Sequence, residues 1–156
     1  MTIHEAADQR RATALVCHYG RNNLDGINAI LAEASEADRV VPLIGATLSL
    51  HAHIVPILYT EDGLACLTHM IYALAEDPEV DEDCARAARL AVAHSEQDAT
   101  ATNAVLAAAA HADRATQLIT AILTLFSSTV PTLYSELGLK VLERSILNWA
   151  AREDSE

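Results

Sequence analysis

The stretch ADRVVPLIGATLSLHAHIVPILYTEDGL, residues 37–64, occurs again in altered form as ADRATQLITAILTLFSSTVPTLYSELGL, residues 112–139. Sliding the chain along itself by 75 positions aligns the two stretches without a gap. Between residues 28–77 and 103–152, 23 of 50 aligned positions are identical, far more than chance pairing gives at this composition. Self-similarity at a fixed spacing indicates that one structural unit has been duplicated.

The duplication divides the chain into two tandem copies, residues 1–77 and residues 78–156. The identity weakens toward the start of each copy but keeps the same offset, as at Asp8 and Asp83. The first copy holds 10 acidic and 4 basic residues and the second holds 12 and 6, so each has a net charge of −6. No Gly/Ser-rich spacer joins the copies. We therefore expect one compact body with pseudo-twofold symmetry, a fused analogue of an isologous dimer.

The composition predicts an all-α helical bundle. Apolar residues make up 51% of the chain, which has only 5 Gly and 4 Pro. Ala and Leu predominate, and both favour helix. We expect three or four helices in each copy, the first over residues 5–19 and the second over about 24–34. In the second copy the stretch 95–101 has no helix breaker, so its first two helices are expected to run together over about residues 81–110.

Two features are expected to shape the later helices of each copy. Asp38 and Asp113 suit the N-terminus of a helix, where a carboxylate accepts a free backbone N–H. The prolines of Val55-Pro56 and Val130-Pro131 either begin a helix or kink one, because proline lacks an N–H and clashes with the preceding turn. The residues leave both alternatives open.

Charge and cysteine usage restrict the classes of partner. The net charge of −12 disfavours direct binding to nucleic acid and to anionic membranes. An odd number of cysteines without a CxxC pattern and a polar N-terminus indicate a cytoplasmic protein. Residues 40–60 and 115–135 are uncharged and long enough to span a membrane, but their His, Pro, Ser and Thr content indicates buried helices of a soluble protein.

Motifs for catalysis or metal binding are absent from the sequence. It has no GxGxxG, P-loop, GxSxG, HExxH or EF-hand pattern. His51 and His53 point to different helix faces, whereas Cys66 and His69 share a face but would need two further zinc ligands. No His or Cys recurs in the other copy, although a duplicated site should have paired ligands. We therefore expect no metal, no cofactor and no enzymatic activity.

Residues that recur with their chemistry intact are the candidates for a binding site. They are Asp38, Arg39, Tyr59, Glu61, Asp113, Arg114, Tyr134 and Glu136. The structural interpretation makes the Asp-Arg pairs a helix cap with a surface ion pair, and makes each Tyr a buried ring whose hydroxyl bonds to backbone. The functional interpretation makes them two related surfaces for a partner, since Tyr is favoured at interfaces.

The leading hypothesis is a non-catalytic protein-protein interaction or regulatory protein with two related binding surfaces. It would bind a protein partner or a second copy of itself. Three alternatives stay open: a pocket for a small apolar ligand between the halves, an acidic mimic of nucleic acid that inhibits a nucleic-acid-binding protein, and a metal-dependent activity through Cys66 and His69.

Overall fold

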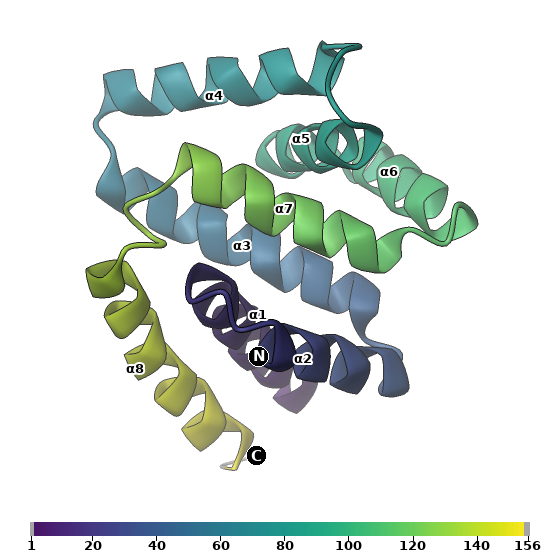
Figure 1. Cartoon of the computed structure of the whole chain (residues 1–156). Coiled ribbons are helices and arrows are strands. Elements are labelled where there is room, and N and C mark those ends of the chain that lie inside the picture. The colour runs from purple at the N-terminus through teal and green to yellow at the C-terminus, as the bar shows by residue number, and fades with distance from the viewer. Residues whose placement is uncertain (1, 155–156) are drawn as a thin grey trace. The chain divides into compact units, whose positions relative to one another are not determined.

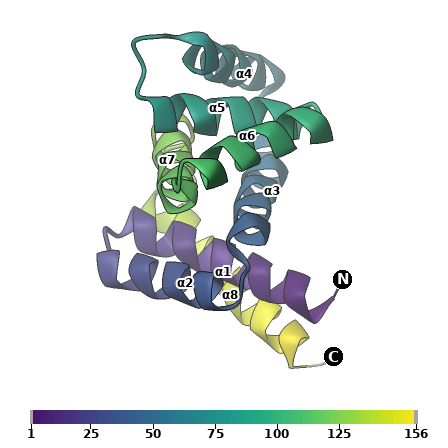
Figure 2. The same cartoon turned by 90° about the vertical axis from the view of Figure 1, so that its right-hand side faces the viewer.

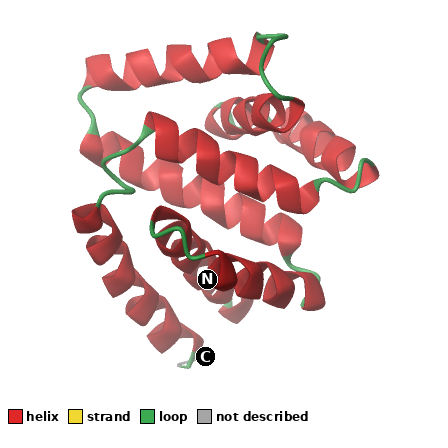
Figure 3. Cartoon of the chain, in the orientation of Figure 1, coloured by secondary structure: helices red, strands yellow, loops and turns green. Residues whose placement is uncertain are grey.

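The computed structural model describes residues 2–154, which form eight helices and no strand (Figure 1, Figure 3). The helices are α1 (Ile3–Gly20), α2 (Leu24–Glu36), α3 (Val40–Leu58), α4 (Glu61–Glu76), α5 (Glu82–Ser95), α6 (Ala99–His111), α7 (Ala115–Thr129) and α8 (Glu136–Glu153). The prediction of an all-α helical bundle is confirmed, with four helices in each sequence copy.

Contacts between residues divide the chain into two compact units that cut across the sequence copies. Unit 1 comprises the chain up to Leu50 together with Val130 onward, and unit 2 comprises His51–Thr129. Unit 1 therefore contains α1, α2, the first part of α3, and α8. Unit 2 contains the end of α3 and helices α4 to α7. Each unit takes its fourth helix from the other sequence copy, so the boundary at residues 77/78 is not a boundary between compact units.

In unit 1 the most extensive helix pair is α1 with α8, and Figure 2 shows the two running side by side. Leu15 and Val16 of α1 and Leu139 and Leu142 of α8 are almost completely buried. Gly20 permits the close approach, because a Cβ atom there would lie 2.9 Å from the Leu139 side chain. The aliphatic stripe of α8 therefore packs against α1, the helix at the opposite end of the sequence.

In unit 2 helix α5 is central and packs on α4, α6 and α7. Its buried face is rich in alanine, which lets the neighbouring helices approach closely. Helix α7 contributes a fully buried stripe that includes Ile122 and Leu123. Buried His51 stacks on Phe126 with ring centroids 4.0 Å apart. Helix α4 buries only Leu67 completely, so most of its surface stays open in the part of the chain that the structure describes.

Four residues other than glycine have positive φ angles between residues 2 and 154, and all four end a helix. They are Asn22 (53°), Asp38 (53°), Gln97 (56°) and Asp113 (54°). The backbone N–H of Arg39 donates to the Ala34 carbonyl at 2.7 Å, as that of Arg114 does to Ala109 at 2.8 Å. These bonds complete Schellman turns, in which a left-handed residue closes the helix end. Short polar side chains such as Asp tolerate that conformation.

Two predictions about helix ends are therefore wrong. Asp38 and Asp113 do not cap α3 and α7, since they terminate α2 and α6. The expected continuous helix over residues 81–110 is divided into α5 and α6, because Gln97 takes the left-handed conformation and the Asp98 carboxylate accepts the Ala101 N–H at 2.9 Å. A capping carboxylate and one left-handed residue suffice to end a helix without Gly or Pro.

The two Val-Pro sequences adopt different structures. Helix α3 continues through Pro56 to Leu58. Helix α7 stops at Thr129, and residues 130–135 form consecutive turns, with the Leu133 N–H donating to the Val130 carbonyl at 3.2 Å. Helix α8 then begins after its N-cap residue Ser135, whose hydroxyl accepts the Gly138 N–H at 3.3 Å. Pro56 is therefore internal to α3 in the first copy. In the second copy Pro131 lies in the turns between α7 and α8 and does not begin a helix.

Candidate functional site: two grooves beside Asp-Arg clusters

Each unit contains a cluster of one aspartate and two arginines that joins its helices. In the Asp8 cluster of unit 1, Arg39 donates to Asp8 from both Nε (3.4 Å) and Nη2, and Arg11 donates to the same carboxylate at 3.2 Å. The carboxylate thus ties α1 to the residue immediately before α3. It accepts charge-assisted hydrogen bonds from two guanidinium groups, which are the stronger kind.

The Asp83 cluster of unit 2 repeats this arrangement at positions 75 residues later. Arg114 donates to Asp83 from Nε (3.3 Å) and Nη2, and Arg86 donates to Asp83 at 3.1 Å. The Arg114 guanidinium, followed by that of Arg86, holds the pKa of the Asp83 carboxyl below its ordinary value. Asp83 in turn raises the pKa of Arg114. Both ion-pair partners are therefore stabilised in their charged forms.

The two carboxylates are buried, whereas the arginines reach the surface. Asp8 and Asp83 are only 3% and 8% exposed. The side chains of Arg39 and Arg114 are 30% and 45% exposed. The partner of each arginine is thus a carboxylate 31 residues earlier in the chain, and not the aspartate beside it. Asp8, Arg11, Asp83 and Arg86 were missed as site residues, although their recurrence at the same offset pointed to them.

A groove of about 280 Å³ opens beside the Asp8 cluster, between α1 and α3 in unit 1. We call it groove 1. It is lined by Glu5, Asp8, Gln9, Arg39, Pro42, Ala46 and Ser49. One wall is formed by polar side chains of α1, and the other by the small side chains of α3.

A larger groove of about 450 Å³ opens beside the Asp83 cluster, between α5 and α7 in unit 2. We call it groove 2. It is lined by Asp81, Asp83, Cys84, Thr116, Gln117, Thr120, Ala121 and Thr124. Five of these positions lie 75 residues after a lining position of groove 1: Asp83, Cys84, Gln117, Ala121 and Thr124. The grooves therefore occupy corresponding places in the two sequence copies.

The thiol and one hydroxyl of groove 2 have defined surroundings. Burial raises the pKa of the Cys84 thiol, so at neutral pH it stays protonated and weakly nucleophilic. The Thr120 hydroxyl donates to the carbonyl of Thr116 at 3.3 Å, within its own helix. Between residues 2 and 154, no group of three or more His, Cys, Asp or Glu side chains is arranged to hold a metal ion.

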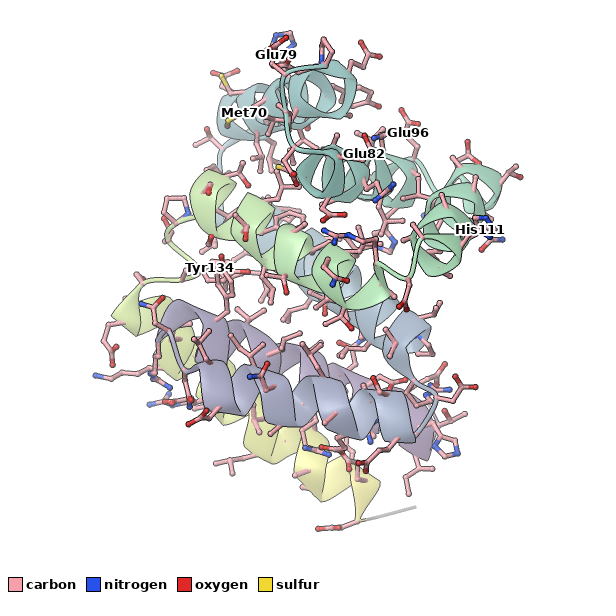
Figure 4. All side chains as sticks on the ribbon, turned by 45° about the vertical axis from the view of Figure 1, so that its right-hand side comes forward. Met70, Glu79, Glu82, Glu96, His111 and Tyr134 are labelled. Carbon is pink, nitrogen blue, oxygen red and sulfur yellow. The ribbon has the colours of Figure 1, made fainter. Side chains whose placement is uncertain are left out.

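The paired tyrosines are packed inside their units. The Tyr59 hydroxyl donates to the Thr129 carbonyl at 3.2 Å in unit 2. In unit 1, Tyr134 meets Tyr19 edge to face with ring centroids 6.1 Å apart, beside the purple ribbon of α1 (Figure 4). Burial raises the pKa of the Tyr134 hydroxyl. Both rings are half-buried, and Tyr59 makes the hydroxyl-to-backbone bond that the structural interpretation describes.

The remaining predicted residues lie at exposed helix ends. Glu61 and Glu136 occupy the first turns of α4 and α8, and Asp38 and Asp113 are exposed where α2 and α6 end. The predicted set is also divided: Asp38, Arg39, Tyr134 and Glu136 belong to unit 1, whereas Tyr59, Glu61, Asp113 and Arg114 belong to unit 2. Of the eight residues, only Arg39 lines either groove, and Arg114 reaches groove 2 through Asp83.

Exposed apolar side chains gather on the outward face of α8. Leu137, Val141 and Leu147 are 75%, 59% and 73% exposed. Cys66, His69 and Met70 are exposed on α4, where Figure 4 shows Met70 at the surface. Single exposed aliphatic side chains are common on protein surfaces, so these residues alone assign no contact surface.

Helix α3 is the one helix among residues 2–154 that is long and apolar enough to cross a membrane. Because a core helix of a soluble protein has the same properties, this feature alone assigns no membrane role. The fold is all-α, and a groove lies beside the Asp-Arg cluster of each unit. No known protein family, curated protein or solved structure matches the chain.

Proposed function

We propose that the chain is a non-catalytic interaction protein built from two tandem copies of one unit, residues 1–77 and 78–156, and that grooves 1 and 2 bind segments of a protein partner. The copies would be related by pseudo-twofold symmetry. The observation that carries this proposal is the occurrence of a groove beside an Asp-Arg-Arg cluster at corresponding positions of both copies.

The duplication is supported by local structure as well as by sequence identity. The left-handed residues Asn22 and Gln97 are 75 positions apart, as are Asp38 and Asp113. The helix caps Thr60 and Ser135 have the same spacing. Helix ends that recur at one offset are expected when an ancestral unit is copied, because caps and turns depend on nearby residues.

A binding role is supported by the chemistry of the grooves. Their walls hold amide, hydroxyl and carboxylate groups without an activated nucleophile or a matched general base. The charged groups that line the grooves include Glu5 and Asp81, and the whole chain carries a charge of −12. A partner that presents a basic, hydrogen-bonding segment complements these grooves. A cytoplasmic location agrees with this role and stays part of the proposal.

The test places one arginine in groove 2, at Thr120, and one beside groove 1, at Gly45, which lies about one helical turn from Pro42 and from Ser49. Gly45 and Thr120 are corresponding positions, and a Cβ atom at Gly45 meets no atom within 4 Å. Gly45→Arg with Thr120→Arg should fill both grooves and repel a basic partner without disturbing the core. The control, Ala32→Arg with Ala107→Arg, adds the same charge at corresponding exposed positions of α2 and α6.

Affinity capture from the source cells with wild type, groove variant and control gives the readout. We expect partners held by the wild type and the control to be lost from the groove variant, while circular dichroism is the same for all three. Retention of every partner by the groove variant would reject the grooves as binding sites.

A small apolar ligand is a second candidate, favoured by a groove of about 400 Å³ among α4, α5 and α6 of unit 2. Ala75, Val92, Ala93, Ala101, Ala104 and Val105 supply its apolar lining. Tyr72 donates to Glu96 at its rim, and Figure 4 shows Glu96 at the surface near the end of α5. The nucleic-acid mimic has less support, since seven carboxylates pair with Arg or Lys.

A further inference from the structure

One short sequence adopts two conformations in this chain. Val-Pro-x-Leu-Tyr occurs at residues 55–59 and again at 130–134. In the first instance α3 runs through the proline and ends at Leu58. In the second, α7 ends before the proline, and the N–H groups of Leu133 and Tyr134 donate to the Val130 and Pro131 carbonyls at 3.2 and 3.1 Å. The local residues therefore permit both a helix and a turn.

The segment 130–135 joins α7, which belongs to unit 2, to α8, which belongs to unit 1. Helix α4 packs on α5, the helix that follows it in sequence, and the two are joined by residues 77–81. Helix α8 instead packs on α1 at the beginning of the chain. No loop joins α8 directly to α1, so the two helices of this pair can come from different molecules.

The contacts between α8 and α1 are specific. Arg10 donates to Glu153 at 2.7 Å, Arg21 pairs with Glu143, and the Cys17 thiol lies 3.8 Å from the Leu139 carbonyl. The Arg21 guanidinium lowers the pKa of Glu143. The charges are segregated, with both cations on α1 and both anions on α8. The same pairing is available to an α8 helix from a second molecule.

We infer that α8 is exchanged between two copies of this chain, each α8 packing on the α1 of the other, with residues 130–135 as the hinge. In the exchanged dimer α7 extends through Pro131 toward Leu133, as α3 extends through Pro56 to Leu58. This inference rests on the proposed interaction function and specifies a second copy as one partner. Exchange replaces every contact between α1 and α8 with an identical one, so only the hinge conformation and the entropy of association change.

The first test uses two variants whose charges are complementary only across an exchanged dimer. Variant A is Arg10→Glu with Arg21→Glu, and variant B is Glu143→Arg with Glu153→Arg. Each variant alone places like charges between α1 and α8. In an exchanged A–B dimer, the acidic α1 of A meets the basic α8 of B, and the wild-type α1 of B meets the wild-type α8 of A. Both helix pairs then regain opposite charges.

We expect the equimolar mixture, after warming to allow exchange, to form a dimer of two 16.7 kDa chains in size-exclusion chromatography with light scattering. Its association constant should exceed that of either variant alone roughly tenfold. Its melting temperature should rise above those of A and B. The control carries all four substitutions in one chain, which restores opposite charges between α1 and α8 in every pairing and should associate as the wild type does. A mixture that remains two monomers with unchanged melting temperatures overturns the inference.

Hinge variants of the otherwise wild-type chain supply a test that does not depend on the stability of A and B. Pro131→Ala removes the helix breaker and should raise the dimer fraction severalfold at a fixed protein concentration. Pro56→Ala is the matched control, because helix already continues through that position. Equal dimer fractions for the wild type and both proline variants also overturn the inference. The groove variant keeps its hinge and its α1–α8 contacts, so failure of the grooves and failure of exchange are separable.

Discussion

Residues 55–64 and 130–139 share Val, Pro, Leu, Tyr, Glu, Gly and Leu at corresponding positions, yet they have different structures. The first stretch continues α3 and then begins α4, whereas the second forms a run of turns before α8. The turns place backbone carbonyls against Gly138: a Cβ atom there would lie 2.3 Å from the Leu133 oxygen. At Gly63 the nearest atom would be a Tyr59 ring carbon at 3.2 Å. The two corresponding glycines therefore differ in the space that they leave for a side chain: Gly138 has none, whereas Gly63 meets only a tyrosine ring.

Gly138→Ala and Gly63→Ala test this difference and should give the largest effect. We expect Gly138→Ala to lower the free energy of unfolding by about 3 kcal/mol, because backbone carbonyls cannot move aside without breaking the turn. Gly63→Ala should change it by at most about 1 kcal/mol, since alanine favours helix and only a ring edge must adjust. Urea denaturation of both variants measures the two values. Equal losses would mean that the two stretches are alike in solution.

The Asp-Arg clusters, in contrast, have the same structure in both units. Asp83→Asn should lower the free energy of unfolding at pH 7 by about 2 kcal/mol, because two guanidinium groups lose a charged acceptor. Asp8→Asn should have a similar effect. A large difference between the two variants would show that the clusters are not equivalent, and denaturation at pH 7 is again the measurement.

The Asp83 cluster also predicts a pH dependence. Its arginines lower the pKa of the Asp83 carboxyl below the ordinary value of 3.8, so the carboxylate contributes stability above that pH and loses it as the pH falls through the lowered pKa. The difference in free energy of unfolding between wild type and Asp83→Asn should therefore shrink on acidification below about pH 4. A difference that stays constant down to pH 2 would contradict the assigned ion pair.

Tyr59→Phe should have the smallest effect. It removes the hydroxyl that donates to the Thr129 carbonyl but keeps the ring, so we expect a loss of about 1 kcal/mol. The free energy of unfolding from urea titration measures this loss. An unchanged value would indicate that water replaces the hydroxyl without cost.

Prediction from the sequence succeeded for features that depend on neighbouring residues and was incomplete where two conformations are close in energy. The helical class follows from Ala- and Leu-rich stretches with few glycines. Asp38 and Asp113 were placed at a helix boundary correctly but at the wrong side of it, because aspartate suits both an N-cap and a left-handed C-terminal residue. Helix α5 ends next to Gln97 without the Gly or Pro that usually marks a helix end.

The candidate site was only partly predictable for a different reason. Recurrence at one offset identified Arg39 and Arg114, but it could not say that each binds an aspartate from the first helix of its copy. The half-buried tyrosines and the exposed glutamates recur equally well, because duplication preserves packing residues and surface residues alike. Lining residues such as Gln9 and Cys84 differ between the copies and were not found.

The residues themselves are sufficient for the helical class and the 75-residue repeat, since helix propensity and self-similarity are properties of the residues along the chain. They do not establish that α8 lies on α1 while α4 lies on α5, or that grooves open beside Asp8 and Asp83. Those features depend on tertiary packing, because each apolar helix stripe could pack against several other helices with similar free energies. The choice among them depends on hinge geometry and on ion pairs between distant residues.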